Sequence, residues 1–546
     1  MRFPSLLFVA LVLTPSLLFA DTARDLEPPA PLPSFAELEA AGARIGEIRV
    51  VTRNIFDTED PRENNLLFRG ANALHIRTQP HVVRRLLLFH SGEPVSARVI
   101  EETERLLRGE RYLYDVALRP VAVHDGVVDI EVETHDTWSL DINASATRAG
   151  GTNTSSIGIS EYNLLGTGMA VSYARSNEVD RSGNEFFVSD EHAFDGWTNV
   201  SLSVANNSDG RRDAISAVRP FYALDTRWAA GAVAVSDDRI DPVYNAGETV
   251  SEYRHKQRRA ELFYGRSRGL IAGWTRRASI GLSLQDDRYS VEPGRIAPPE
   301  LPHDEKLVGP FVRFELIEDR YQRLENRNIM GEPEFFALGF HSTVQLGLAS
   351  TGLGSSHDAL VYSGTVSRGF EPARDHTLLT SAAITGQLVD GHVYRQQLGG
   401  RVRYYRPQGR RGLFYAAASA DMLSNPDVLD MLLLGGDNGL RGYPLRYQSG
   451  TRRALFTVEQ RAYSDWYLWR LFRIGGAAFA DLGRAWGGAN VNTVNSGWLG
   501  DVGIGLRIVS TRAAFGNVLH VDLAFPLQAT GDIEKVQLLV RAKASF

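Results

Sequence analysis

Few residues in this sequence have the types and spacing that catalysis needs. There is no cysteine, no Gly-x-Ser-x-Gly sequence and no His-Glu-x-x-His sequence, and the 13 histidines lack the spacing of metal ligands. Gly435–Gly439 precedes neither a helix nor a Lys-Ser/Thr pair, so it is no phosphate loop. We therefore expect no enzyme activity, catalytic residue, metal site or cofactor. A serine and a histidine brought together across strands stay an open alternative.

One arginine and two carboxylates could instead form a specific ion-paired centre. Arg441 lies in the glycine-rich stretch GGDNGLRGYPL, and Glu459 and Asp481 stand on the two alternating runs that follow. Glu459 and Asp481 alternate with the apolar residues of their strands, so both carboxylates should point to the polar side. A buried guanidinium is costly unless it is paired, and its planar fork fits carboxylates. The alternative is an arginine solvated in a glycine turn.

The runs that carry these carboxylates belong to a long β region over residues 137–546. Runs of alternating apolar and polar residues, separated by Gly, Asn, Asp and Pro, continue through it, as in Met169–Arg175. A soluble sandwich or a transmembrane barrel would give this pattern, and so many strands are too many for one sandwich. Aromatic residues cluster in Asp465–Phe472, which suits an interfacial girdle. The pattern favours an antiparallel outer-membrane β-barrel.

The amino-terminal part predicts export and a small domain. Met1–Ala20 has one basic residue and a short apolar run before Asp21, as in a secretory signal peptide. The Pro-rich residues 21–44 favour an extended linker, with a helical turn near 35–41. Residues 45–136 predict an α/β domain with the order strand, helix, helix, strand, strand.

The composition narrows the partners. With 59 Lys+Arg against 65 Asp+Glu, the net charge of −6 argues against nucleic-acid binding. The absence of cysteine excludes a disulfide framework.

Four motifs and the domain order carry a resemblance to a known family. The small domain, above all residues 92–120, resembles a POTRA domain. The β region resembles the barrel of the BamA-like outer-membrane assembly and translocation superfamily, the bacterial surface antigen family. The four motifs are Asn163–Gly168, Leu440-Arg441-Gly442-Tyr443, Phe479-Ala-Asp481-Leu-Gly483, and a carboxy-terminal β-signal, VQLLVRAKASF, which includes Val540 and ends at Phe546.

The resemblance implies a geometry for the arginine. In the family, the loop arginine folds back into the barrel lumen and meets acidic residues, which would pair Arg441 with Asp481 and bring Glu459 close. The match has departures: Leu440 replaces the usual valine, the β-signal lacks an upstream glycine, and only one POTRA-like domain is present.

The resemblance also implies 16 barrel strands, five of them after the arginine loop. Five runs do follow that loop, near 452–464, 472–484, 498–510, 515–526 and 535–546. Upstream the runs number nearer fifteen than the eleven expected. Either some of them pair as extracellular hairpins, or this barrel is larger than 16 strands.

From this resemblance we expect an outer-membrane protein that assists the insertion, assembly or translocation of polypeptides, with its POTRA-like domain in the periplasm. Its partners would be outer-membrane lipid, extended client polypeptides and periplasmic accessory proteins, and the barrel would be monomeric. A passive channel and a structural or adhesive barrel are the alternatives.

Overall fold

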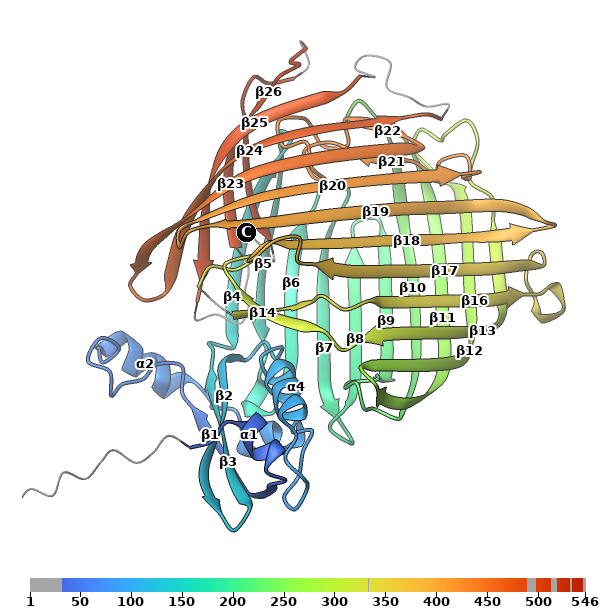
Figure 1. Cartoon of the computed structure of the whole chain (residues 1–546). Helices are drawn as coiled ribbons and strands as arrows, with labels where there is room; N and C mark the ends of the chain where they lie inside the picture. The colour runs from blue at the N-terminus through green and yellow to red at the C-terminus, as the bar shows by residue number, and fades with distance from the viewer. Residues whose placement is uncertain (1–31, 332, 489–496, 512–517, 531–532, 544–546) are drawn as a thin grey trace, which may run out of the picture.

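The structure is a computed structural model, and it describes residues 32–331, 333–488, 497–511, 518–530 and 533–543. It consists of a small α/β unit and a large closed barrel (Figure 1). The expected signal peptide, residues 1–20, lies outside the described residues. No helix in the described ranges is long and apolar enough to cross a membrane.

The α/β unit is built on a three-stranded sheet with the order β1-β3-β2, in which β3 is parallel to β1 and antiparallel to β2. Helices cover this sheet, and their apolar residues, including Val83, Ile100 and Leu107, form one core with Ile130 and Val132 of β3. The elements are α1 (Phe35–Ala40), β1 (Arg44–Arg53), α2 (Leu66–Leu74), α3 (Pro80–Arg85), α4 (Ala97–Leu107), β2 (Leu113–His124) and β3 (Val127–Asp136).

Two of these helices differ from the sequence-based expectation. The helical turn expected near 35–41 is α1, which begins at a capping box formed by Ser34 and Glu37. Leu38 of α1 is buried in the core of the unit, so this part of the expected linker packs on the sheet. The second helix, α2, lies in an insertion over residues 54–79 that the sequence did not predict, since the helix is short and only Phe68 of it is buried.

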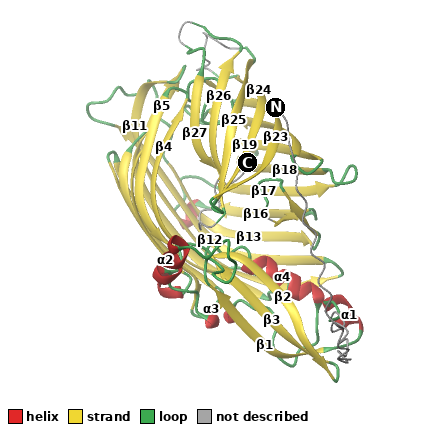
Figure 2. Ribbon diagram, turned by 90° about the vertical axis from the view of Figure 1, so that its left-hand side faces the viewer, coloured by secondary structure: helices red, strands yellow, loops and turns green. Residues whose placement is uncertain are grey.

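The β region forms a closed antiparallel barrel of 20 strands among the described residues (Figures 1 and 2). The expected fold of a barrel rather than a sandwich is confirmed. The strands are β4 (Leu140–Ala149), β5 (Thr152–Glu161), β6 (Met169–Asn177), β7 (Ser182–Ala193), β8 (Thr198–Asn207), β9 (Gly210–Arg219), β10 (Trp228–Asn245), β11 (Glu248–Ile271), β12 (Trp274–Val291), β13 (Glu305–Glu318), β16 (His341–Ala349), β17 (Ala359–Phe370), β18 (Thr377–Val389), β19 (His392–Gln408), β20 (Gly412–Ser424), β23 (Arg452–Leu468), β24 (Phe472–Trp486), β25 (Leu499–Ser510), β26 (Val518–Pro526) and β27 (Gln537–Lys543).

The expected number of 16 strands is wrong. Five strands follow the arginine loop, as expected, but fifteen precede it, and all of them are part of the wall. The four motifs lie on a few strands and turns, and each added hairpin widens the barrel without changing them. The sequence motifs therefore predict the strands and turns that contain them, but they do not determine the number of strands in the barrel.

Four more strands lie outside the wall. The hairpin of β14 (Tyr321–Glu325) and β15 (Pro333–Ala337) connects β13 to β16, and β21 (Leu432–Leu434) pairs with β22 (Gln448–Gly450) between β20 and β23. Two short 3₁₀ helices, Leu164–Gly166 and Thr351–Leu353, lie in turns.

The barrel wall is apolar outside and polar inside. On β25, Val502, Ile504 and Leu506 are exposed on the outer face, whereas Asp501 and Arg507 are fully buried inside. The same inversion recurs on β23, where Phe456 and Val458 are exposed and Glu459 and Arg461 are buried. A soluble β protein would bury the apolar set instead.

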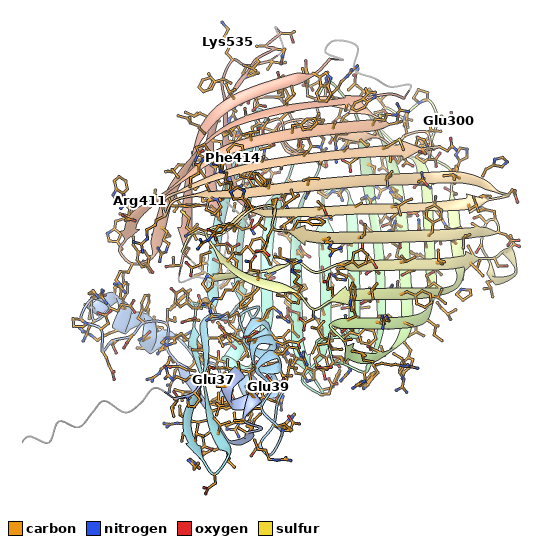
Figure 3. All side chains as sticks on the ribbon, viewed as in Figure 1. Glu37, Glu39, Glu300, Arg411, Phe414 and Lys535 are labelled. Carbon is orange, nitrogen blue, oxygen red and sulfur yellow. The ribbon has the colours of Figure 1, made fainter. Side chains whose placement is uncertain are left out.

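We call the end of the barrel next to the α/β unit the proximal end and the opposite end the distal end. The turns at 162–168 and 194–197 are proximal, and the long loop 425–451 leaves β20 at the distal end. Figure 3 shows Glu300 and Lys535 in distal loops and Arg411 in the proximal turn between β19 and β20.

Candidate functional site

The loop over residues 425–451 folds from the distal end into the lumen and places Arg441 against the inner wall. The Arg441 guanidinium grips Asp481 of β24 with two hydrogen bonds, from Nε at 2.7 Å and from Nη2 at 3.0 Å. Its Nη1 donates to Glu459 of β23 at 2.9 Å and lies 3.7 Å from a carboxylate oxygen of Asp522 on β26. The arginine is thus tied to three strands of the wall.

Burial makes this centre strongly coupled. The side chains of Arg441 and Asp481 are at most 7% exposed, and the ring of Phe479 stacks on the guanidinium at 3.4 Å. Burial alone would lower the pKa of Arg441, but the adjacent carboxylates of Asp481, Glu459 and Asp522 raise it above its ordinary value. The guanidinium is therefore permanently charged, and its removal would leave buried carboxylates without their partner.

The residues beside Arg441 complete the seat. The Gly442 amide donates to Asp501 at 3.0 Å, and a β-carbon on Gly442 would lie 2.7 Å from that of Asp501, so only glycine fits. The Tyr443 hydroxyl donates to the Gly500 carbonyl at 2.9 Å, and Leu440 is fully buried.

Two further cations extend the polar network along the inner wall. Arg461 donates to Glu459 at 2.9 Å and stacks on Tyr415, while Arg507 forms an ion pair with Asp522. The carboxylates that hold the loop are thus shared with arginines of the wall. This arrangement contains no nucleophile beside a base, and its chemistry is that of a structural lock.

The same loop contacts both sides of the barrel closure. Arg541 of β27 donates to the carbonyl oxygen of Asp437 in the loop at 3.0 Å. On the other side, Gly150 in the β4–β5 turn packs so closely on the loop that a β-carbon there would lie 2.3 Å from the Leu445 nitrogen. The loop therefore joins the last strand to the first hairpin.

The closure itself is short. Among the described residues, β27 and β4 are matched at one pair, Val540 with Arg148. The neighbouring ladder between β27 and β26 has seven pairs, and that between β4 and β5 has ten. The barrel is closed, and among the described residues its first and last strands meet in the shortest ladder of the wall, which we call the seam.

From the proximal end, the β14–β15 hairpin enters the lumen. At its tip, the Asn328 side chain accepts a bond of 3.1 Å from Tyr405, and the Arg327 carbonyl accepts one of 2.9 Å from Arg461. At its base, Arg105 of α4 stacks on Tyr321 at 3.9 Å. The hairpin thus spans from the α/β unit to the inner wall that also holds Arg441.

The α/β unit is fixed to the proximal turns. In the Asn163–Gly168 turn, Asn163 donates to Thr78 at 2.8 Å, and the Gly166 carbonyl accepts from the Gln79 amide at 2.9 Å. Leu224, in the turn after β9, donates its amide to Glu102 of α4 at 2.8 Å. This first motif therefore serves as a docking turn.

A cluster of Glu110, Glu191 and His192 also lies at this junction, with the ligand atoms of the three side chains close enough together to hold a metal ion. His192 Nε2 lies 3.2 Å from Glu110. No sequence motif predicts this cluster, because Glu110 and His192 are far apart in the chain.

The remaining predicted site residues have the following places. Phe479 and Gly483 lie on the inner face of β24 with Asp481, and Gly483 lies against Leu434 and Leu455. Val540 lies in the seam, and Phe546 lies outside the described residues. The seam contacts of Asp437 and Arg541, and the lumenal hairpin, were missed, because single loop residues and an irregular insertion leave no periodic pattern.

No protein-family model and no curated protein sequence matches the chain. Among solved structures, the chain is similar to CdiB from Escherichia coli, at 14% identity and a TM-score of 0.46, over 91% of this chain and 76% of that one. It is also similar to CdiB from Acinetobacter baumannii, at 12% identity and a TM-score of 0.43, over 91% of this chain and 73% of that one. A third similar structure is BamA from Haemophilus ducreyi lacking POTRA domains 1-3, at 13% identity and a TM-score of 0.38, over 91% of this chain and 84% of that one.

Proposed function

We propose that this protein is a monomeric outer-membrane barrel that assists the insertion, assembly or translocation of polypeptides. The exposed apolar outer face of strands such as β25 fits contact with lipid, and the buried charges inside fit an aqueous lumen. In this orientation the proximal end and the POTRA-like α/β unit, residues 45–136, face the periplasm. The distal loops face the outside of the cell.

The single observation that carries the proposal is the seam between β4 and β27. Among the described residues this ladder has one matched pair, against seven between β27 and β26, so the edges of β4 and β27 meet in the shortest ladder of the described wall. Such an edge can accept an extended polypeptide by β-augmentation, which is how a barrel could template or pass a client strand. A barrel built only to be a static pore would gain from a long seam instead.

The Arg441 loop supports this proposal as a latch across the seam. It holds β27 through Arg541 and Asp437, touches the β4–β5 turn at Gly150, and is itself held by Asp481 and Glu459. Opening the seam would require the loop contact on at least one side to break. The buried arginine keeps the loop in place while one side moves.

The α/β unit supports a role for client polypeptides. In its sheet the strands β1 and β2 are the edges, and an edge strand can pair with an extended chain. The docking turn at Asn163 places this sheet at the entrance to the lumen (Figure 1). Clients, and periplasmic accessory proteins, would meet this unit before the seam.

A passive channel fits the structure less well. The loop with Arg441 enters the lumen from the distal end, and the β14–β15 hairpin enters from the proximal end. A cavity of about 860 Å³ lies along the strands β10–β13 and β16–β19, and its lining includes Arg259, Glu261 and Glu305. Both occluding segments would have to leave for a solute to cross.

Depletion of the protein, followed by quantitative proteomics of the outer membrane, tests the proposal. Loss of one outer-membrane or secreted protein would indicate a dedicated transporter, and loss of many would indicate an assembly factor. An unchanged proteome would refute the proposal and favour a pore or a structural role.

A further inference from the structure

Helix α2 has apolar residues on the side that faces away from the protein. Leu66, Leu67 and Leu74 are 81%, 70% and 79% exposed, and with Gly70 and Ala73 they cover the face opposite buried Phe68. Arg69 is the one charged residue of the helix. The helix is therefore amphipathic, with Asn72 and Arg69 away from the leucines, and its leucine-rich face is the exposed one. An amphipathic helix normally turns such a face to an apolar environment.

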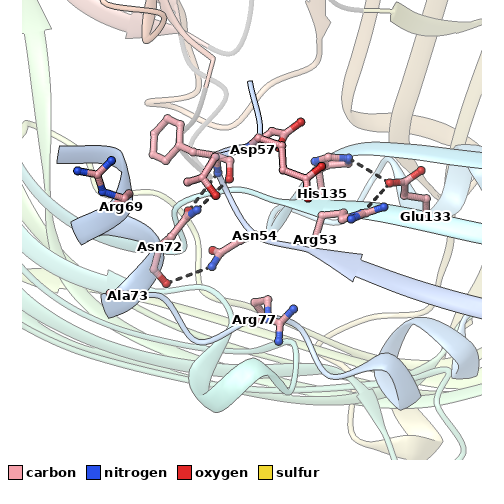
Figure 4. Close-up of a pocket in the computed structure, with 12 residues that line it drawn as sticks. Arg53, Asn54, Asp57, Arg69, Asn72, Ala73, Arg77, Glu133 and His135 are labelled. Atoms are coloured by element: carbon pink, nitrogen blue, oxygen red, sulfur yellow. Dashed lines mark hydrogen bonds and ion pairs between the residues drawn. The ribbon is translucent and has the colours of Figure 1, made fainter. Parts of the chain in front are cut away.

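The helix is held in this orientation. Phe68 stacks on Phe56 with ring centroids 3.9 Å apart, and the Asn72 side chain bonds both the amide and the carbonyl of Phe56, at 3.1 and 2.8 Å. The cavity of about 640 Å³ beside these residues is lined by charged side chains that include Arg53, Arg77 and Glu133 (Figure 4). This cavity therefore offers the exposed leucines a charged lining and not an apolar one.

The position of α2 points to the membrane surface. Arg470, in the proximal turn between β23 and β24, donates to Glu63 just before the helix at 3.0 Å, and Leu471 packs with the Phe56–Phe68 cluster. Figure 1 shows α2 beside the rim of the barrel, projecting away from the sheet of the α/β unit. On the same hairpin, Trp466 and Trp469 are 68% and 76% exposed, as in an interfacial aromatic belt.

We propose that α2 is an interfacial anchor that inserts Leu66, Leu67 and Leu74 into the periplasmic leaflet of the membrane that holds the barrel. Its occupant is the phospholipid bilayer, because α2 is attached to the proximal rim at Arg470 and Leu471, on the hairpin that exposes Trp466 and Trp469. The insertion 54–79 carries four carboxylates and three arginines, so apolar burial and not charge drives the contact. The anchor fixes the α/β unit beside the β23–β24 turn.

Because the chain contains no cysteine, single cysteines can report on this contact in the full protein. The variant Leu67→Cys is labelled with an environment-sensitive fluorophore and the protein is placed in phosphatidylcholine nanodiscs, with and without nitroxide-labelled lipid. Ile159→Cys, exposed on the outer face of β5, is the positive control, and Val123→Cys, exposed on the far hairpin of the α/β unit, is the negative control.

We expect a blue-shifted emission at position 67 and quenching by lipid comparable to that at position 159, several-fold greater than at position 123. Quenching at 159 without quenching at 67 would overturn the anchor while leaving the membrane barrel intact. A blue shift at 67 without lipid quenching would also overturn it, because protein or a second copy would then cover the helix. Absence of quenching at 159 would refute the membrane barrel itself, and the anchor with it.

A second variant tests the energetic role. A triple variant removes the apolar face and leaves Phe68 and Asn72 in place; its substitutions are Leu66→Ser, Leu67→Ser and Leu74→Ser. With the label moved to Ala73→Cys, we expect the triple variant to lose most of the lipid quenching, while Val121→Ser with Val123→Ser, in the same labelled background, leaves it unchanged. Equal quenching in both would overturn the proposal.

Discussion

Val540 of β27 is paired with Arg148 of β4, and among the described residues this is the one matched pair between the two strands that close the barrel. Both residues are at outward positions of their strands. Antiparallel partners lie within the Cα separation that a disulfide requires.

A disulfide at this pair should lock the seam. We expect Arg148→Cys with Val540→Cys to cross-link on oxidation, and the oxidised protein to lose its effect on client proteins, with recovery on reduction. Gel mobility before and after reduction measures the cross-link, and the outer-membrane proteome measures the effect on client proteins. The matched control is Val458→Cys with Ala480→Cys, an outward pair inside the long β23–β24 ladder, which should cross-link without loss. Full activity of the oxidised seam variant would contradict lateral opening.

Removal of the Arg441 guanidinium should release the latch without abolishing the barrel. Arg441→Ala leaves Asp481 and Glu459 as buried carboxylates without the arginine, at a cost of about 3–5 kcal/mol. We expect a lower temperature for the heat-dependent shift in gel mobility, although the folded form still accumulates. Arg441→Lys should recover part of the lost stability, because lysine keeps the positive charge but cannot form the bidentate hydrogen bonds to Asp481. Arg410→Ala, exposed in a proximal turn, is the control, and equal behaviour of it and Arg441→Ala would count against the latch.

A methyl group on Gly442 should displace the same loop by sterics alone. The added β-carbon would lie 2.7 Å from the Asp501 β-carbon and 3.0 Å from the Pro526 nitrogen, both in the barrel wall. We expect Gly442→Ala to make residues 425–451 several-fold more sensitive to added protease in intact cells. Gly497→Ala, where a β-carbon would meet nothing within 4 Å, should have no effect.

The proximal hairpin should limit conductance. Replacing residues 321–337 by a short Gly-Ser linker removes the contacts of Asn328 and Arg327 with the wall. In planar bilayers we expect a larger and steadier conductance than that of the unaltered protein. Combining the deletion with Arg441→Ala should increase it further, since the lumen is occluded from both ends. An unchanged conductance would show that the hairpin does not occlude the lumen.

One distal contact should depend on pH. The hydrogen bond and charge of Asp427 raise the pKa of His303 above its ordinary value, and the two side chains lie 2.9 Å apart. A group whose pKa is raised by folding stabilises the fold below its ordinary pKa and loses that contribution as the pH rises through the folded value. Proteolysis of loop 292–304 should therefore speed up as the pH rises above the ordinary histidine range. His303→Gln should remove this pH dependence, and its persistence in that variant would assign it to another group.

Sequence alone predicted the parts of the structure that follow a regular pattern. Alternation identified the strands, and the parity of Glu459 and Asp481 placed both on the inner face, where they meet Arg441. The count of about fifteen alternating runs before the loop was right, whereas the 16 strands implied by the resemblance were wrong. Alternation marks every strand of the wall, whereas a motif marks only the strand or turn that contains it.

The rest depended on contacts that no period encodes. The helix α2 is nine residues long, and its stripe of Leu66, Leu67 and Leu74 is exposed, although the same stripe in a sequence would also suit a buried face. The Arg541–Asp437 bond joins residues 104 positions apart through a backbone carbonyl, which any residue type supplies. Irregular segments such as the β14–β15 hairpin are positioned by tertiary packing, which the sequence pattern does not reveal.

The seam also sets the order in which the chain can fold. Every ladder of the barrel except that between β27 and β4 joins strands that follow one another in chain order, so these ladders can form by zipping of neighbours with little loop-closure entropy. The last ladder must bring together residues separated by nearly the whole β region, and among the described residues it contains one matched pair. Closure is thus the step that spans the most chain, and until it occurs the barrel is an open, curved sheet with β4 and β27 at its two edges.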